Sequence, residues 1–331
     1  MKKLIILPLL LICAAITSCG SKPVRKTIYT MDTAATFTVY GGNAEGALSA
    51  AEAELYRLDA LMSRSNKRSD IYPLNVSGTG TVSDETASVI RTALDVCRKT
   101  NGAFDITVTP VMDAWGFFGQ EYRVPSAEEI DTLLPRVDYN NVTVDGSIVT
   151  LSNNSTLDLG GIAKGYASGR AAQILKDNGI NSALISFGSA IEAVGSKPDG
   201  GAWTIGITNP QNPEEYILTL DITDTCVATS GSYEQVFEDN GKRYHHIIDP
   251  STGYPADNGL ASVSVIGGDP TRADALSTAL FVMGLDGAAE YWRSNGGFDV
   301  VFITASGEIY YTAGLHGNIS AVDGQVLEII E

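Results

Sequence analysis

Predicted helices gather toward the start of this 331-residue chain, and predicted strands follow one another through its middle and end. Apolar residues at helical spacing predict a helix over Ala44 to Met62, and Ser83 is placed to cap a second helix. Alternating segments predict strands at 182–187, 203–207, 217–222, 261–266, 299–304 and 308–312. This order favours an α+β fold, with mixed or antiparallel strands and flanking helices, over a doubly wound parallel sheet.

Turn and capping signals set the limits of further elements. They predict a hairpin over 27–40, a capped helix at 126–134, a hairpin over 142–151, a helix from Gly160-Gly161 to about 178, and helices at 270–283 and 286–294. Residues 229–233 predict a polar turn. No repeat or long linker divides the chain. We therefore expect residues 27–331 to form one large domain, with room for a cleft between two lobes.

The charge balance bears on the partners of the protein. The formal net charge is -17, with 39 acidic and 22 basic residues. Binding to nucleic acid depends on clustered Lys and Arg, so we expect no nucleic-acid partner.

The N-terminus has the pattern of an export signal. Two lysines are followed by an apolar run from Leu4 to Ile16, which is too short to span a bilayer, and small residues precede Cys19. We expect residues 1–18 to be a lipoprotein signal peptide and Cys19 to be the lipidated residue. Residues 19–26 would then be the tether. The protein would be anchored to the membrane by lipid in a bacterial cell envelope, facing the periplasm or the exterior.

Two cysteines remain in the mature chain, Cys97 and Cys226. They could pair in an oxidising compartment, or they could be two buried apolar thiols. The sequence leaves both alternatives open, and it contains no Cys/His spacing typical of a metal site.

A glycine-rich turn, LDLGGIAKGYA at 157–167, stands where a strand should lead into a helix. Free N–H groups at such a helix start can bind an anion, and Lys164 adds a positive charge on the first turn. The segment is neither a Walker A loop nor a GxGxxG fingerprint. Taken alone, it could also be a plain tight turn with a solvated lysine.

A second segment, ADALSTAL at 273–280, places polar side chains in an apolar helix. Asp274 and Thr278 are four residues apart, so they share one helix face. A buried carboxylate is costly unless it is paired or bound to metal, and carboxylate with hydroxyl suits Mg²⁺. The alternative is a core Asp satisfied by nearby hydrogen bonds.

The third segment, HHIIDPSTGYP at 245–255, contains two of the three histidines of the chain. His245 and His246 should face opposite ways along a strand, so one of them should point toward solvent or a site. A histidine at such a site is the usual general base at neutral pH, although it could equally satisfy a turn.

Together, in this order, the three segments resemble the ApbE family of FAD:protein FMN transferases. The resemblance extends to MDTAATFTVY (31–40), TNGAFDITVTPVMDAWGFF (100–118) and VATSGSY (227–233), and so covers nearly all of the predicted mature chain. Two features depart from the family pattern. Asp32 follows Met31 where glycine is common, and residues 61–66 replace a stretch that usually contains an aromatic residue.

The resemblance implies a role for particular residues. Asp274 and Thr278 would bind Mg²⁺ together with a backbone carbonyl of Gly161, and His246 would be the base, so that Asp274 and His246 are the catalytic candidates. The implied FAD contacts are Met31, Ala103, Phe104, Asp105, Asp158, Lys164 and Ile248.

The reaction that the resemblance implies moves the FMN part of FAD onto a Thr or Ser hydroxyl of an exported or membrane flavoprotein, with release of AMP. Two alternatives remain open at this point. One is an FAD pyrophosphatase, in which water replaces the acceptor hydroxyl, and the other is a flavin-binding lipoprotein without turnover.

Overall fold

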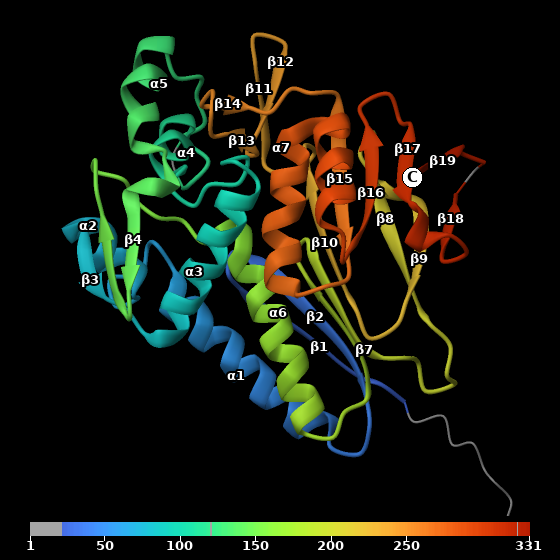
Figure 1. The fold of residues 1–331 in the computed structure, drawn as a ribbon. Coiled ribbons are helices and arrows are strands. Elements are labelled where there is room, and N and C mark those ends of the chain that lie inside the picture. Colours follow the sequence, from blue (N-terminus) through green and yellow to red (C-terminus); the bar gives the residue numbers. More distant parts are fainter. Residues whose placement is uncertain (1–21, 120, 323) are drawn as a thin grey trace, which may run out of the picture.

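The computed structural model describes residues 22–119, 121–322 and 324–331 (Figure 1). The predicted signal peptide, residues 1–18, and the predicted lipid attachment at Cys19 lie outside these ranges. Within them, no helix has both the length and the apolar character that crossing a membrane requires.

A nine-stranded sheet organises the fold, in the order β1-β2-β6-β7-β10-β15-β16-β17-β19. Its neighbouring strands are antiparallel, except that β17 and β19 run parallel. The strands are β1 (Val24–Thr30), β2 (Thr33–Tyr40), β6 (Ser182–Phe187), β7 (Ala190–Gly195), β10 (Cys226–Gly231), β15 (Leu260–Ile266), β16 (Asp299–Thr304), β17 (Ile309–Thr312) and β19 (Leu327–Ile330). The predicted α+β class is confirmed.

Long helices cover one face of this sheet. They are α1 (Ala44–Met62), α3 (Asp84–Lys99), α6 (Gly160–Asp177) and α7 (Pro270–Asn295). Helix α6 lies between α1 and α7 (Figure 1). Leucines of α1 such as Leu55 and Leu58 are fully buried, together with Ile185 and Phe187 of β6, in the main hydrophobic core. This packing fixes where the first turn of α6 lies relative to α7.

A second, three-stranded sheet covers the other face, with strand order β18-β9-β8. Its strands are β8 (Trp203–Asn209), β9 (Asn212–Ile222) and β18 (Ile319–Ala321). Ile205, Leu218 and Leu220 pack against Val301 and Tyr311 of the large sheet in a separate core. The molecule is therefore layered as helices, large sheet and small sheet.

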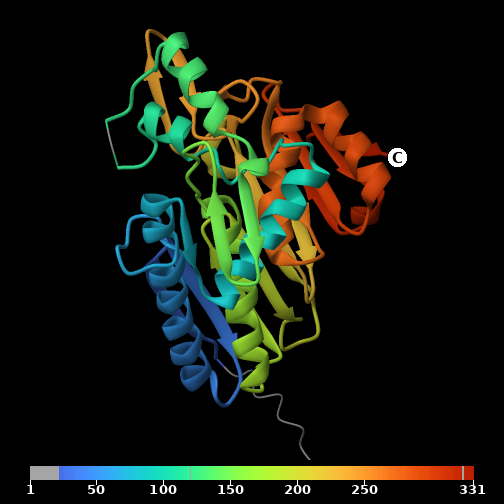
Figure 2. The ribbon, with the colours of Figure 1, turned by 60° about the vertical axis from the view of Figure 1, so that its left-hand side comes forward.

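An aromatic cluster holds the remaining segments at one end of the molecule (Figures 1 and 2). These are α4 (Thr109–Trp115), α5 (Ala127–Leu133), the hairpin β11 (Val236–Asp239) and β12 (Lys242–His245), and the short pair β13 (Ile248–Asp249) and β14 (Tyr254–Pro255). The ring of Trp115 is fully buried, 5.1 Å from the ring centroid of Tyr244, and its Nε1–H donates to the Gly253 carbonyl.

Smaller elements complete the chain. They are α2 (Ile71–Ser77), the sheet of β3 (Thr79–Thr81), β5 (Ile148–Leu151) and β4 (Val142–Asp145), and the 3₁₀ turns η1 (Leu134–Arg136), η2 (Tyr139–Asn141) and η3 (Ala313–Leu315).

Two boundaries differ from those predicted. Strand β1 begins at Val24, which pairs with Val39, so the last three residues of the predicted tether, 19–26, belong to the sheet. Residues Thr229 to Gly231, predicted as the start of a polar turn, lie in strand β10. In both places hydrogen bonds to a neighbouring strand outweigh the local polar composition.

The predicted break between two C-terminal helices is present within α7. Gly284 has φ 72° and ψ 172°, which interrupts the helix. The Asn258 side-chain amide donates to the carbonyls of Phe281 and Val282 at 2.7 and 3.1 Å, so it caps the first of the two helical segments.

Candidate active site

Asp274 is buried where α6 crosses α7. It is 4% exposed, and its Oδ2 accepts a hydrogen bond of 2.8 Å from the backbone N–H of Gly165. A Cβ at Gly165 would lie 2.1 Å from the Pro270 carbonyl oxygen and 2.6 Å from Asp274 Cβ. Only glycine permits this close approach, which brings the Asp274 carboxylate against the first turns of α6.

The Asp274 carboxylate lacks a charged partner. Within the described ranges, no Lys, Arg or His side chain forms an ion pair with it. Burial raises the pKa of Asp274 above its ordinary range, and the more distant charge of Lys164 opposes this rise. A buried carboxylate in this setting is stabilised by a cation bound beside it.

Hydroxyl groups gather one helical turn further along α7 from Asp274. Ser230 Oγ of β10 lies 3.1 Å from Thr278 Oγ1 and 2.9 Å from Ser277 Oγ, and Ser277 donates to the Asp274 carbonyl at 2.8 Å. The sequence had placed Ser230 in a turn, so its position beside Thr278 was not predicted. The carboxylate and the hydroxyls are the hard oxygen donors that Mg²⁺ prefers.

Gly161, the third predicted metal ligand, lies in the first turn of α6. In a regular α-helix its carbonyl would accept from the Gly165 N–H, the same group that donates to Asp274. The Gly161 carbonyl and the Asp274 carboxylate thus compete for one N–H donor. Oxygen lone pairs that this donor does not use could bind a cation. No group of three or more His, Cys, Asp or Glu side chains that could hold a metal ion occurs in the described chain.

The glycine-rich turn is held from several sides. Asp158 Oδ1 accepts from the Gly160 N–H at 2.5 Å, and Lys164 Nζ donates to the Gly160 carbonyl at 2.9 Å. Asn75 bonds both the N–H and the carbonyl of Leu157, at 2.7 and 2.8 Å. The role of Asn75 could not be read from the sequence, because the two residues are 82 positions apart.

Lys164 connects the predicted site residues. Burial raises the pKa of Asp158 and of Asp274, and the Lys164 charge acts against both rises. Burial and, to a lesser extent, the Lys164 charge lower the pKa of His246 to about 4. The structure therefore brings Asp158, Lys164, His246 and Asp274 into one site.

The two histidines differ in their remaining hydrogen-bond capacity. His245 accepts from the Ile247 N–H at Nδ1 and meets the Ala256 carbonyl at Nε2, so both of its nitrogens are used. His246 Nδ1 meets the Glu234 carbonyl at 3.1 Å and must therefore carry the proton. This leaves the lone pair on His246 Nε2 without a partner among the described residues, whereas His245 has no nitrogen free.

Met31 lies in a strained turn between β1 and β2. Met31 and Asp32 have φ values of 49° and 57°, the left-handed region that a two-residue hairpin requires. Asp59 Oδ2 accepts from Thr30 Oγ1 at 2.8 Å and from the Met31 N–H at 3.1 Å, and so holds this turn. A non-glycine residue kept in this conformation is typical of ligand sites.

The β1–β2 turn lies close to Lys164. A Cβ on Gly188, in the turn between β6 and β7, would lie 3.1 Å from Thr33 and 3.5 Å from Lys164 Cδ. Met31 and Lys164, predicted as FAD contacts from distant parts of the chain, are therefore on the same side of the site.

The predicted segment Ala103–Asp105 supports the glycine-rich turn. The Phe104 ring lies against Gly161, where a Cβ would be 3.0 Å from its Cε2. Asp105 is buried, and its two oxygens accept from Thr107 and from the Tyr139 N–H. The structure thus gives the Asp105 side chain a role in holding the loop.

Ile248, also predicted as an FAD contact, is buried in the aromatic cluster. A ligand contact at this position would involve its backbone. Cys97 and Cys226, left open by the sequence, are both buried and unpaired.

Arg64 contacts Asp113 and Asp158 across long sequence distances that no local pattern predicts. Its Nη2 donates to both carboxylate oxygens of Asp113, at 2.7 and 2.8 Å, and its Cζ lies 4.3 Å from the ring centroid of Phe118. Its Nη1 lies 3.7 Å from Asp158 Oδ2.

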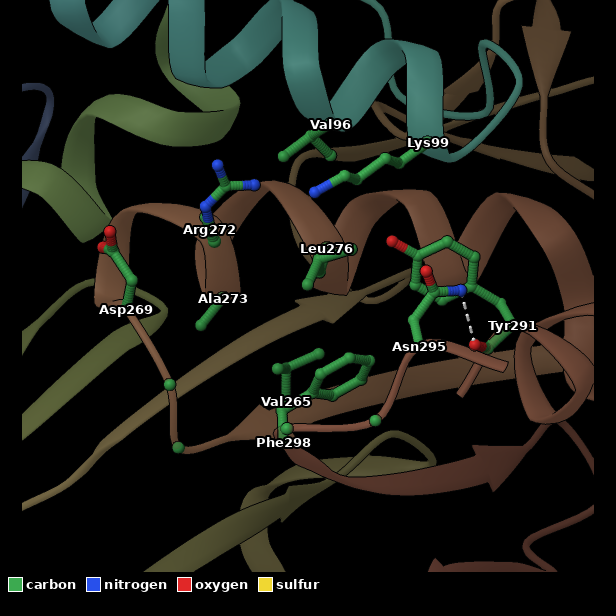
Figure 3. Close-up of a pocket in the computed structure, with 14 residues that line it drawn as sticks. Val96, Lys99, Val265, Asp269, Arg272, Ala273, Leu276, Tyr291, Asn295 and Phe298 are labelled. Atoms are coloured by element: carbon green, nitrogen blue, oxygen red, sulfur yellow. Dashed lines mark hydrogen bonds between the residues drawn. The ribbon is translucent and has the colours of Figure 1, made fainter. Parts of the chain in front are cut away.

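A cavity of about 250 Å³ lies between α3 and α7, away from this site (Figure 3). Figure 3 shows Arg272 and Leu276 of α7 facing it, beside Lys99 of α3. Arg272 and Lys99 both pair with Asp95, at 2.6 and 3.1 Å, so the two cations share one carboxylate. Asp274 and Thr278 are not among the residues that line this cavity.

Comparison with known proteins places this fold and site in one family. Residues 31–302 match the model of the ApbE family, and the chain belongs to that family. A relative from Escherichia coli strain K12 named FAD:protein FMN transferase is 33% identical over 269 residues, which cover 78% of this chain and 74% of the relative. A relative of the same name from Vibrio cholerae serotype O1 is 36% identical over 236 residues, 69% of this chain and 68% of its own.

Solved structures agree in fold. The ApbE protein of Thermotoga maritima superposes with a TM-score of 0.82 at 35% identity, over 87% of this chain and 96% of its own. The flavin transferase ApbE from Vibrio cholerae gives a TM-score of 0.81 at 28% identity, over 89% and 99% of the two chains.

Proposed function

We propose that this protein is a Mg²⁺-dependent FAD:protein FMN transferase, which attaches FMN to a Thr or Ser hydroxyl of an exported or membrane flavoprotein and releases AMP. The observation that carries the proposal is the buried Asp274 carboxylate, which has a hydroxyl cluster beside it and no basic partner within the described ranges. Family membership and the names of the relatives support it.

The transfer exchanges one phosphorus–oxygen bond for another. The acceptor hydroxyl oxygen attacks the phosphorus on the FMN side of FAD, the bond from that phosphorus to the bridging oxygen breaks, and AMP leaves with that oxygen. The hydroxyl proton goes to His246 Nε2. Such reactions need little covalent help from the protein, so positioning and charge compensation dominate.

The residues have separate tasks in this reaction. Asp274, Thr278 and the Gly161 carbonyl would hold Mg²⁺, which when bound offsets negative charge on the diphosphate. Lys164 adds a fixed positive charge at the start of α6, where helix N–H groups also favour an anion. Met31 and Ala103 would contact the nucleotide from the flanking turns.

His246 is suited to accept a proton at neutral pH. Burial lowers its pKa to about 4, so the imidazole is neutral well below pH 7. The Glu234 carbonyl fixes the proton on Nδ1, and Nε2 remains available to the acceptor hydroxyl.

Export and lipid anchoring are part of the proposal. Residues 1–18 would be removed and Cys19 would carry the lipid, which would place the enzyme in the same compartment as its acceptor. Globomycin-sensitive processing of the precursor, together with loss of membrane association in a Cys19→Ser variant, would support this. Unchanged membrane association of that variant would contradict it.

One assay tests the enzymatic proposal. The chain from residue 22 is mixed with FAD, Mg²⁺ and an acceptor flavoprotein domain, then run on a denaturing gel that is read for flavin fluorescence. We expect a fluorescent acceptor band that is abolished by EDTA. Release of FMN and AMP without any labelled acceptor, across several acceptor domains, would instead indicate an FAD pyrophosphatase.

A further inference from the structure

Two polar atoms at the edge of the site lack hydrogen-bond partners. Arg64 Nη1 and Asp158 Oδ2 are both buried, and neither has a partner among the described residues. They lie 3.7 Å apart, which is too far for a hydrogen bond. Leaving charged groups unsatisfied in this way is costly, so such atoms are usually satisfied by a ligand or by water.

The surrounding contacts keep the two atoms apart. Arg64 Nη2 is bound to both oxygens of Asp113, and its guanidinium lies over the Phe118 ring. Asp158 is held by its Oδ1 bond to the Gly160 N–H, and its own N–H donates to the Ile106 carbonyl. The gap is therefore a fixed feature of the site, with a donor on one side and an acceptor on the other.

A phosphate does not fit this pair, because its oxygens only accept hydrogen bonds and would face the unpartnered Asp158 Oδ2, which is itself an acceptor. A neutral group that offers an acceptor beside a donor fits it better. FAD contains two such ring edges, the pyrimidine edge of the isoalloxazine and the amino edge of adenine.

We propose that Arg64 is a further substrate-binding residue, whose Nη1–H and the neighbouring Asp158 Oδ2 together bind an acceptor–donor ring edge of FAD. Asp113 and Phe118 are positioning residues, because they fix the guanidinium plane. This inference rests on the proposed function, since it takes FAD as the substrate.

The test measures FAD binding apart from catalysis. Quenching of flavin fluorescence is titrated in EDTA for the wild-type chain, for Arg64→Gln and for Arg68→Gln. Arg68 is exposed on the same segment and makes no ion pair among the described residues. Arg68→Gln is therefore a control that removes the same positive charge as Arg64→Gln. We expect the dissociation constant for FAD to rise at least about tenfold in Arg64→Gln, because a hydrogen bond to a charged group is lost. In Arg68→Gln it should stay within about twofold of the wild-type value.

A second variant and two fragments complete the test. Arg64→Lys keeps the charge but loses the planar donor, so its affinity should fall between those of the wild type and Arg64→Gln, with unchanged thermal melting. Titration with FMN and competition with ADP show which ring of FAD is bound. Weaker binding of FMN by Arg64→Gln would indicate the isoalloxazine edge, and weaker binding of ADP would indicate the adenine edge. Unchanged binding of FAD, or of both fragments, would overturn the inference.

Failure of this inference differs from failure of the proposed function. Wild-type protein that binds FAD through Arg64 but never labels an acceptor would contradict the transferase and leave the role of Arg64 standing. Normal labelling of the acceptor, together with unchanged FAD binding by Arg64→Gln, would support the transferase and contradict the role of Arg64.

Discussion

The backbone N–H of Gly165 donates to the Asp274 carboxylate at 2.8 Å, although in a regular helix it would serve the carbonyl of Gly161. One hydrogen bond thus joins the glycine-rich turn of α6 to the acidic helix α7. It holds Asp274, a proposed metal ligand, next to the turn that contains Gly161, so a change at Gly165 or Asp274 should alter both metal binding and the position of the turn.

Replacing Asp274 should remove catalysis while keeping the fold. Asp274→Asn retains the oxygen that accepts from Gly165 but lacks the charge that a cation requires. We expect Mg²⁺-dependent transfer to fall about a hundredfold or more. Turnover is measured across a Mg²⁺ titration, with Asp286→Asn, an exposed acid on the same helix, as the control. Near-normal turnover of Asp274→Asn would contradict the role of Asp274 as a metal ligand.

Gly165→Ala should destabilise the protein by overpacking. Its Cβ would lie 2.1 Å from the Pro270 carbonyl oxygen, so α6 and α7 must separate. We expect the free energy of unfolding to fall by about 1–3 kcal/mol and activity to fall with it. Urea denaturation checks this against Gly42→Ala, where the added Cβ would meet open space. Equal stability of the two variants would show that the helix crossing tolerates the methyl group.

His246→Gln should slow the transfer without weakening FAD binding. General base catalysis typically contributes about 10²–10⁴-fold, and a loss in this range is expected in kcat. Because the pKa of His246 is about 4, wild-type kcat should stay level above about pH 5 and fall as the pH drops through 4. His316→Ala is the control, since that histidine is exposed. A loss of FAD affinity with an unchanged rate for the bound complex would contradict the role of base.

Glu192 should make stability depend on pH. It is buried in β7 and its Oε2 has no hydrogen-bond partner among the described residues. Burial raises its pKa to about 7, with Lys176 opposing the rise. The folded state therefore binds the proton more tightly than the unfolded state does. The stability from this group is present below about pH 4.5 and is lost as the pH rises through 7.

The Glu192→Gln variant isolates this effect. It keeps the shape without the charge, so it should raise the free energy of unfolding at pH 8 by about 2–3 kcal/mol and have little effect at pH 4.5. Denaturation at the two pH values measures the difference, with Glu238→Gln on the exposed β11–β12 hairpin as the control. A stabilisation that is the same at both pH values would show that packing, and not ionisation, is responsible.

Local sequence signals predicted the elements that have strong periodicity. Helix α1 has the predicted limits, Ala44 to Met62, because its apolar stripe faces one continuous core. The break of α7 at Gly284 was also predicted, since glycine ends helices readily. Strand β7 was missed, because a short run of small apolar residues interrupted by Glu192 has no clear period.

The site was predictable in its residues but not in its supporting contacts. Asp158, Lys164, His246 and Asp274 belong to recognisable segments, and the structure brings them together. Arg64, Asn75 and Ser230 act through partners far away in the sequence, which no local pattern reveals. Asp105, predicted as an FAD contact, shows a further structural role: its carboxylate accepts from Thr107 in its own loop and from the distant Tyr139 N–H.

The most direct test of the transferase is the stoichiometry of its products. AMP release and acceptor labelling would be measured in the same reaction, with the mass of the labelled acceptor peptide determined by mass spectrometry. We expect one AMP for each FMN moiety added at a Thr or Ser, and no AMP when that hydroxyl is removed by mutation to Ala. AMP released at the same rate without the acceptor hydroxyl would contradict this expectation, because water would then be the attacking group.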